Sequence, residues 1–260
     1  MPMKKLLFAT LFTISMVLKA EEAQFGFTTG LDYSTGKYGL SEATRIKYVP
    51  FTGKLEYGRW LAKITVPWLE INGPGAVTGG DSKIILSNVT RPRSTESGLG
   101  DIVSSITYTA FQSADQKLTL DVGAKIKFAT ASAQKGFGTG SNDYAVQLDA
   151  YKTMQEWDKL TLLGTLGYKT YGKPELSNYG LHNTWFGTLG AAYKINGSNS
   201  TGLLVDLREA AWAQNSEIRE YTLYYSHRFN PSYNLQTYAT TGDTRSSVDF
   251  SAGLMLGIRW

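Results

Sequence analysis

The stretch VDFSAGLMLGIRW, residues 248–260, ends the chain and decides its fold. Every second residue from Val248 to Trp260 is apolar, and the residues between them are small or polar except for Met255. A period of two is typical of a β-strand with one apolar and one polar face. We therefore expect a final strand whose apolar face contacts either a second protein layer or lipid.

Alternation of the same kind recurs through the chain and predicts twelve strands. The clearest case is segment 117–128, where each even-numbered residue from Leu118 to Phe128 is apolar and the others are polar or glycine. A helical interpretation fails because the period is two and because glycines such as Gly164 and Gly187 interrupt the segments. The predicted strands are 24–34, 43–57, 60–70, 100–111, 117–128, 143–154, 159–171, 182–194, 200–211, 217–229, 233–241 and 248–260.

The predicted connections alternate in length along the chain. The short ones fall at 58–59, 112–116, 155–158, 196–199 and 230–232, and the longer ones near 35–42, 71–99, 129–142, 172–181, 210–216 and 242–247. Outer-membrane barrels combine short periplasmic turns, longer external loops and an even strand count. The sequence therefore predicts an all-β protein, a transmembrane antiparallel up-and-down β-barrel of about twelve strands. A soluble lipocalin-like or sandwich protein and a strand count between ten and fourteen are the alternatives.

The N-terminus and the composition fit an exported barrel. Lys4 and Lys5 precede an apolar run from Leu6 to Leu18, and the small Ala20 follows, which predicts a signal peptide over 1–20 and a barrel over 21–260. Without residues 1–20 the 26 basic residues fall to 23 against 22 acidic ones, so nothing favours nucleic acid as a partner. The absence of cysteine excludes disulfides and thiolate metal sites. No later window is apolar enough for a transmembrane helix.

Charged residues interleave with the apolar faces of the predicted strands. A lysine or arginine facing lipid at the bilayer midplane costs about 2–4 kcal/mol, so we expect these side chains to face the lumen. They would either pair and fill the interior or line a polar pathway that selects solutes. A twelve-stranded barrel could hold a narrow pore, a plug or a binding pocket. The expected pathway residues are Lys63, Asp121, Lys125, Lys127, Asp149, Arg208, Glu220 and Arg228.

Aromatic residues cluster near the predicted strand ends, where outer-membrane barrels carry two aromatic girdles. The girdle residues that we expect are Trp60, Trp68, Tyr168, Trp185, Tyr221 and Trp260. The last strand, which ends on Trp260, also resembles the signal that the outer-membrane assembly machinery reads. Membrane lipid and this machinery are therefore the expected macromolecular partners.

Three other features carry weaker hypotheses. Loop 71–99 is long enough either to constrict the pore or to extend outside it. The glycine-rich run Gly136–Gly140 favours a hairpin turn over a phosphate loop, because no strand–helix context follows it. His182 and His227 are the only histidines, and no Gly-x-Ser-x-Gly motif is present, so we expect neither catalysis nor a metal or other cofactor.

Several short motifs resemble an outer-membrane β-barrel "transporter" family connected with the MetA-pathway of phenol degradation. They are Val66-Pro67-Trp68, Asn72-Gly73-Pro74-Gly75, Gly98-Leu99-Gly100-Asp101, Gly138-Thr139-Gly140 with Asp143-Tyr144, Leu166-Gly167-Tyr168, and the run from Asn183 to Gly190. The resemblance implies an outer-membrane conduit for aromatic or other small organic solutes. We therefore expect passive passage of such solutes through a charged lumen. The alternatives are a closed barrel with a structural or loop-binding role and an outer-membrane hydrolase.

Overall fold

The structure is a computed structural model that describes residues 22–74, 94–175, 181–213 and 215–260. The predicted signal peptide lies outside these residues. Within them no helix is long and apolar enough to cross a membrane. The strands are β1 (Gln24–Gly36), β2 (Thr44–Tyr57), β3 (Trp60–Gly73), β4 (Ser94–Leu99), β5 (Ile102–Gln112), β6 (Leu118–Phe128), β7 (Asp143–Thr153), β8 (Leu160–Thr170), β9 (Thr184–Lys194), β10 (Asn199–Arg208), β11 (Ile218–Arg228), β12 (Tyr233–Gly242) and β13 (Phe250–Arg259).

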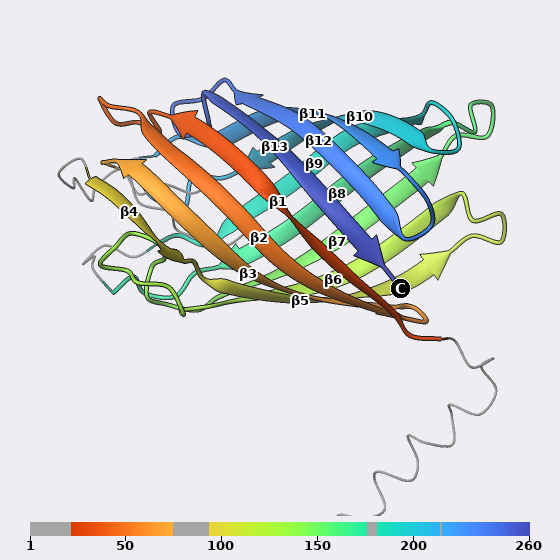
Figure 1. Ribbon diagram of the computed structural model, residues 1–260, viewed down its shortest axis with the longest axis horizontal. Helices are drawn as coiled ribbons and strands as arrows, with labels where there is room; N and C mark the ends of the chain where they lie inside the picture. Colours follow the sequence, from red (N-terminus) through yellow and green to blue (C-terminus); the bar gives the residue numbers. More distant parts are fainter. Residues whose placement is uncertain (1–21, 75–93, 176–180, 214) are drawn as a thin grey trace, which may run out of the picture.

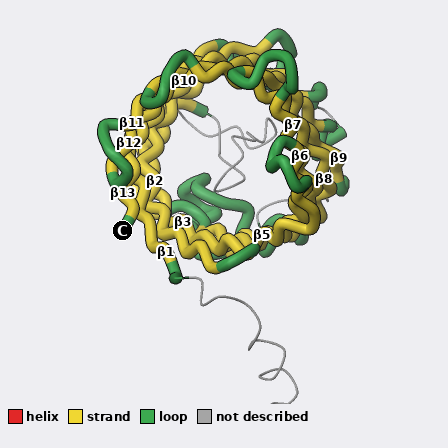
Figure 2. Tube along the Cα trace, turned by 90° about the vertical axis from the view of Figure 1, so that its right-hand side faces the viewer, coloured by secondary structure: helices red, strands yellow, loops and turns green. Residues whose placement is uncertain are grey.

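The strands form one closed antiparallel barrel. Strands that follow each other in sequence pair with each other, except that β5 pairs with β3 instead of β4. Because β1 pairs with both β2 and β13, and β2 pairs with β3, the ring of strands closes. Figure 2 shows this ring from one end. The prediction of a twelve-stranded barrel is confirmed, with β4 as one additional short strand.

The additional strand corrects the prediction of one long loop over 71–99. Strand β3 continues to Gly73, and its end pairs with β4, whereas its beginning pairs with β5. Only Gly100 and Asp101 separate β4 from β5, and the Gly100 N–H donates to the Pro67 carbonyl over 2.9 Å. The remaining part of that predicted loop, residues 75–93, lies outside the described residues. Its expected role as a constriction therefore stays a prediction.

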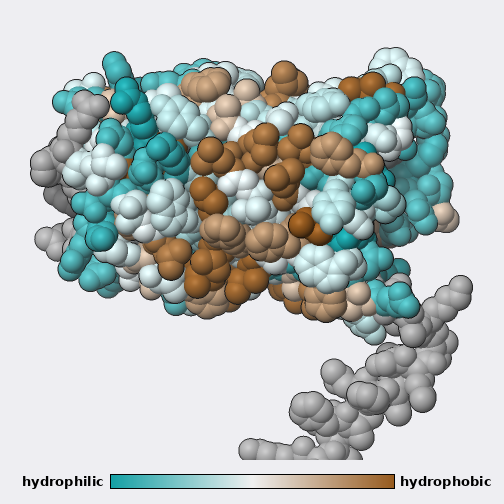
Figure 3. Space-filling view, viewed as in Figure 1, coloured by the Kyte–Doolittle hydropathy of each residue, from teal (hydrophilic) through white to brown (hydrophobic). Residues whose placement is uncertain are grey.

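The two faces of the strands differ as the alternation predicted. On β13 the side chains of Phe250, Leu254, Leu256 and Ile258 are exposed, whereas Ser251 is fully buried. Brown, apolar surface forms a band across the middle of the barrel in Figure 3, between polar ends. An apolar band that is exposed on a closed barrel is suited to lipid, because lipid-facing charges are costly.

The loops are short at one end of the barrel and long at the other (Figure 1). At the short-turn end the connections are 58–59, 113–117, 154–159, 195–198 and 229–232. At the long-loop end, loops 37–43, 129–142 and 243–249 contribute to a buried apolar group, here called the mouth cluster. It consists of Tyr38, Ile46, Leu69, Ile71, Phe137 and Val248. Loop segments inside the ring of strands are visible in Figure 2.

Val248 is the exception in the final stretch. We expected it on the outer face, but it is only 1% exposed and packs in the mouth cluster. The reason is that β13 begins at Phe250, so Val248 belongs to the preceding loop and does not follow the alternation of the strand.

The seam between β1 and β13 closes the barrel. At the short-turn end, the backbones of Phe25 and Trp260 exchange two hydrogen bonds of 3.0 Å, and their rings stack with centroids 6.5 Å apart. Near the other end, Asp32 is buried and its Oδ2 accepts hydrogen bonds from the Tyr238 hydroxyl (2.7 Å) and the Ser251 hydroxyl (2.9 Å). Polar contacts inside and aromatic contacts outside therefore fix the same seam.

Candidate functional site: the charged lumen

Strand register arranges part of the lumen's acidic side chains in one row. Directly opposed pairs connect six inward positions across β6 to β11: Asp121, Asp149, Thr165, Thr188, Asp206 and Glu220. The two threonines in the middle of the row donate hydrogen bonds to the neighbouring carboxylates. Thr165 Oγ1 donates to Asp149, and Thr188 Oγ1 donates to Asp206, each over 2.6 Å. The row is thus a strip of carboxylates held by hydroxyl donors.

A row of lysines begins on the same strand, β6, and extends the other way across β5 and β3 to β2. Lys54 on β2 is directly opposite Lys63 on β3, Lys63 is opposite Ser105 on β5, and Ser105 is opposite Lys125 on β6. Like charges that face each other across strands are destabilising. In this part of the lumen, acidic residues and lysines thus occupy separate rows. The sequence had left open whether the inward charges pair or separate.

At the long-loop end the charges pair instead. Lys127 Nζ lies 2.9 Å from Asp101 Oδ2 and 3.3 Å from Asp143 Oδ2, and Lys169 Nζ lies 3.5 Å from Asp143 Oδ2. All four side chains are nearly completely buried. Because buried charges are costly unless they are paired and hydrogen-bonded, this network fixes the strands and loops that carry it.

The network also ties loop 129–142 to the barrel wall. Lys127 Nζ lies 2.9 Å from the Thr139 hydroxyl, and Asp101 Oδ1 accepts the backbone N–H groups of Thr130 (3.1 Å) and Ala131 (2.9 Å). A Cβ on Gly138 would lie 2.5 Å from the Asp101 carboxylate, so only glycine permits this approach. The Gly136–Gly140 run therefore belongs to a loop between two hairpin strands, as predicted, and it contacts a buried carboxylate.

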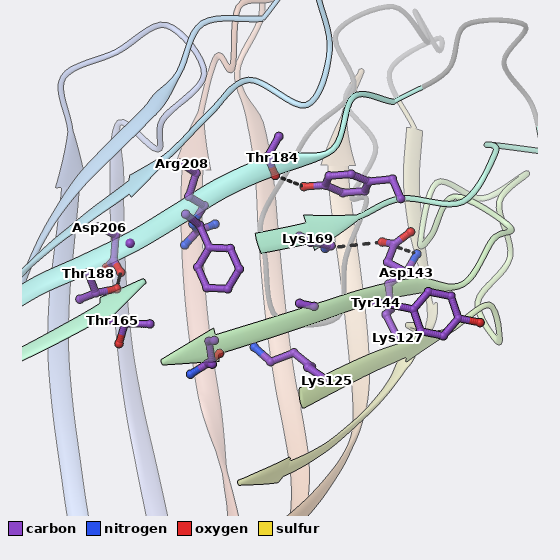
Figure 4. A pocket seen from close by; sticks show the side chains of 15 residues that line it. Lys125, Lys127, Asp143, Tyr144, Thr165, Lys169, Thr184, Thr188, Asp206 and Arg208 are labelled. Carbon is purple, nitrogen blue, oxygen red and sulfur yellow. Dashed lines mark hydrogen bonds and ion pairs between the residues drawn. The ribbon is translucent and has the colours of Figure 1, made fainter. Parts of the chain in front are cut away.

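Two cavities open between these groups inside the barrel. One, of about 230 Å³, is lined by Lys125, Lys127, Asp143, Lys169 and Arg208, among others. Figure 4 shows these side chains extending from β6 to β10 toward a common space. The second, of about 220 Å³, is lined by Lys63 and Lys125 together with hydroxyl-bearing residues of β3 and β5.

The structure distributes the predicted pathway residues over different settings. Lys63 and Lys125 border cavities, Lys127 is buried in the ion-pair network, and Arg208 Nη2 lies 4.0 Å from Glu220 Oε2. Asp121 and Asp149 belong to the acidic row. Arg228 lies at the short-turn end, where it lines a space of about 690 Å³ together with Arg259.

Two important groups were not selected from the sequence. Asp143 stands at the first position of a predicted strand, where alternation alone does not distinguish a cap from a buried ion-pair partner. For Phe137 the sequence predicted only a place in a glycine-rich turn, whereas in the structure its ring is buried against the position of Gly98. An aromatic residue between two glycines, on a loop that follows a lysine-bearing strand, is the signal that could have drawn attention to it.

Comparison with known proteins agrees with this architecture. The family described as "Putative MetA-pathway of phenol degradation" matches residues 26–215, which is well over half of the chain. The chain belongs to this family. The resemblance noted from its motifs is thereby confirmed. No curated protein matches the chain.

Among the solved structures that share this fold are one outer-membrane channel and two porins. The COG4313 outer membrane channel from Pseudomonas putida F1 is 12% identical, with a TM-score of 0.70 over 94% of this chain and 97% of that one. The NanC porin is 10% identical, with a TM-score of 0.57 over 89% and 98%. The KdgM porin is 9% identical, with a TM-score of 0.51 over 91% and 98%. At these identities the likeness establishes the fold of this family member.

The predicted girdle residues all occupy outward positions of the family barrel. Several form aromatic pairs with a partner on an adjacent strand: Trp60 with Tyr108 at 4.6 Å, Tyr168 with Trp185 at 5.0 Å, and Trp260 with Phe25 at 6.5 Å. Trp68 lies on the outer face of β3, and the Tyr221 hydroxyl donates to Asp243 over 3.1 Å. Their role as membrane anchors stays a prediction.

The two histidines lie at different ends of the barrel. The His182 backbone N–H donates to the Ala211 carbonyl at the long-loop end. His227 Nδ1 lies 2.6 Å from Asn199 Oδ1 near the short-turn end, with its ring against Phe229. Within the described part of the chain, no group of three histidine, aspartate or glutamate residues could hold a metal ion.

Proposed function

We propose that the protein is a bacterial outer-membrane channel that passes small organic solutes, aromatic compounds among them, passively through its charged lumen. The observation that carries the proposal is a closed barrel with an apolar outer band and with cavities lined by charged groups inside. Charged cavities inside a closed barrel are suited to the passage of small polar or charged solutes. The family and the fold of its structural neighbours support this interpretation.

In this proposal the long-loop end faces the outside of the cell and the short turns face the periplasm, as in other outer-membrane barrels. The proposal includes export by the predicted signal peptide and insertion by the outer-membrane assembly machinery. The protein would then act by selection of solutes and would catalyse no reaction.

A second function is favoured by the mouth cluster. Six buried side chains from three loops and two strands occupy part of the long-loop end. If they close the lumen, the barrel has a structural role or binds a partner through its loops.

Conductance of the purified, refolded full chain in a planar bilayer separates the two functions. Discrete current steps, which aromatic acids modulate, support the channel. The folding control is the heat-dependent shift in gel mobility. If the folded barrel gives no current steps, and liposomes that contain it take up neither arabinose nor benzyl alcohol in swelling assays, the channel is overturned in favour of the closed barrel.

A further inference from the structure

The row of lysines presents a concentration of positive charge in the middle of the lumen. Each step across neighbouring strands is about 4.8 Å, so the backbones of Lys63 and Lys125, two strands apart, lie roughly 10 Å from each other. Two lysine side chains are long enough to converge on one small group in that span. Ser105 stands between them and adds a hydroxyl.

The arrangement is unfavourable for the empty barrel. Lys54 and Lys63 are directly opposed, and like charges in that position repel each other. Among the described residues, Lys63 has no carboxylate within ion-pair distance. The network around Lys127 shows that this barrel can pair its charges where pairing serves stability. The position of Lys63 opposite Lys54 therefore calls for a functional explanation.

The cavity beside Lys63 and Lys125 supplies the rest of a binding site. Its volume of about 220 Å³ corresponds to roughly seven water molecules, which suits a small molecule rather than a chain of sugars. Thr65, Ser105 and Thr107 provide hydroxyl groups, and Tyr48 and Val103 provide apolar surface. A compact body with one polar end fits such a lining.

The adjoining acidic row sets the charge that the site accepts. On β6 Lys125 stands four positions after Asp121, which is about 13 Å along the strand. Gln147 lines the cavity and donates its amide to Asp149 over 2.7 Å, so this carboxylate lies at the cavity's border. The acidic row lies on the short-turn side of these lysines, whereas Tyr48 and Val103 lie on their long-loop side. A second carboxylate on the solute would therefore meet either like charge or apolar surface, and both are unfavourable.

We propose that Lys63 and Lys125 hold the carboxylate of a small organic monoacid, with its apolar body against Tyr48 and Val103. This site deepens the proposed channel function and rests on it, because it names a class of solute that the lumen retains during passage. The lysines bind as charge-assisted donors, and the acidic row on one side and the apolar surface on the other both disfavour a second carboxylate.

The test uses benzoate as the monoacid, terephthalate as the diacid and benzyl alcohol as the neutral analogue. Chloride conductance of the full-length barrel is measured with each at the same ionic strength, and binding is measured independently by calorimetry in detergent. Lys63→Gln and Lys125→Gln remove one charge each, whereas the separate variant Lys63→Arg keeps the positive charge at position 63. Lys47→Gln removes a lysine that is ion-paired with Glu70 on the outer face and serves as the matched control.

Benzoate is expected to block the current and to bind, whereas benzyl alcohol does neither and terephthalate acts at concentrations at least tenfold higher. Each glutamine variant should raise the half-blocking concentration and the Kd about tenfold, because a charge-assisted hydrogen bond is lost. Lys63→Arg and Lys47→Gln should stay within about twofold of the unaltered protein.

The two measurements separate the site from the channel. A barrel that conducts but binds no benzoate, or binds it equally well in Lys63→Gln, overturns the site and leaves the channel intact. A barrel that does not conduct but binds benzoate, with the loss in both glutamine variants, overturns the channel and supports the site. Block by terephthalate as strong as that by benzoate overturns the discrimination against diacids.

Discussion

Replacing Lys127 by methionine tests whether the ion-pair network stabilises the long-loop end. The substitution keeps most of the side-chain volume but removes the ammonium group that lies 2.9 Å from Asp101 and 3.3 Å from Asp143. Both carboxylates are at most 1% exposed, so water cannot replace the lost charge. Breaking a buried pair in this way costs about 3–5 kcal/mol.

The remaining contacts determine where in this range the loss should fall. Asp143 keeps Lys169 at 3.5 Å and the Gly172 N–H at 3.3 Å, whereas Asp101 keeps only backbone donors among the residues that the structure describes. Asp101 should therefore be the more destabilised group, and Lys127→Met/Asp101→Asn should recover about 1–3 kcal/mol of the loss.

Reversible urea unfolding in lipid vesicles, followed by tryptophan fluorescence, measures these differences. Lys125→Met is the control, because it removes the next inward lysine on the same strand, which borders a cavity and is only half-buried. Its expected cost is below about 1 kcal/mol, because water screens a charge that is only half-buried. Equal losses for Lys127→Met and Lys125→Met, or no recovery in the double variant, would refute the reasoning.

Three further predictions concern the mouth, the seam and a turn. Phe137→Ala should loosen the mouth cluster and raise the single-channel conductance, whereas Phe111→Ala on the outer face should leave it unchanged; equal conductance in both would contradict a role of the cluster in restricting the lumen. Deleting Trp260 removes two backbone hydrogen bonds and a stacked ring from the seam, so the yield of heat-modifiable folded barrel should fall several-fold, whereas Trp260→Phe should retain it. In the exposed turn 113–117, hydrogen bonds from the Ser113 hydroxyl and the Lys117 N–H lower the pKa of Asp115, so the turn gains stability above the ordinary pKa and loses it as pH falls through the lowered value. Ser113→Ala should raise this pKa toward its ordinary value in an NMR titration, and an unchanged titration curve would exclude the hydroxyl as its cause.

Alternation of side chains was sufficient to predict the barrel. A strand such as 117–128 allows only one orientation, since the opposite one would place Lys125 and Lys127 in lipid. The short strand β4 escaped prediction because its sequence, STESGL, contains a single large apolar residue. Its pairing with β3 depends on the neighbouring strand and not on its own pattern.

The site was predictable only as a set of inward charges. Lys125 and Lys127 stand at equivalent positions of one strand, yet one borders a cavity and the other is buried between two carboxylates. The difference arises from Asp101 and Asp143, which come from other strands, and from the loop that covers them. Register between strands and the path of a long loop are properties of distant pairs, so the order of residues in one segment does not contain them.

Closure of the barrel at the seam requires residues from both the first and the last strand. Asp32 receives its Ser251 hydrogen bond from a residue 219 positions later, so the ring cannot close before synthesis has reached the last strand. Until then both edge strands present unpaired backbone groups that invite association with other chains. A chain that lacks β13 should therefore stay an open sheet, and its two exposed edges should promote pairing with other chains.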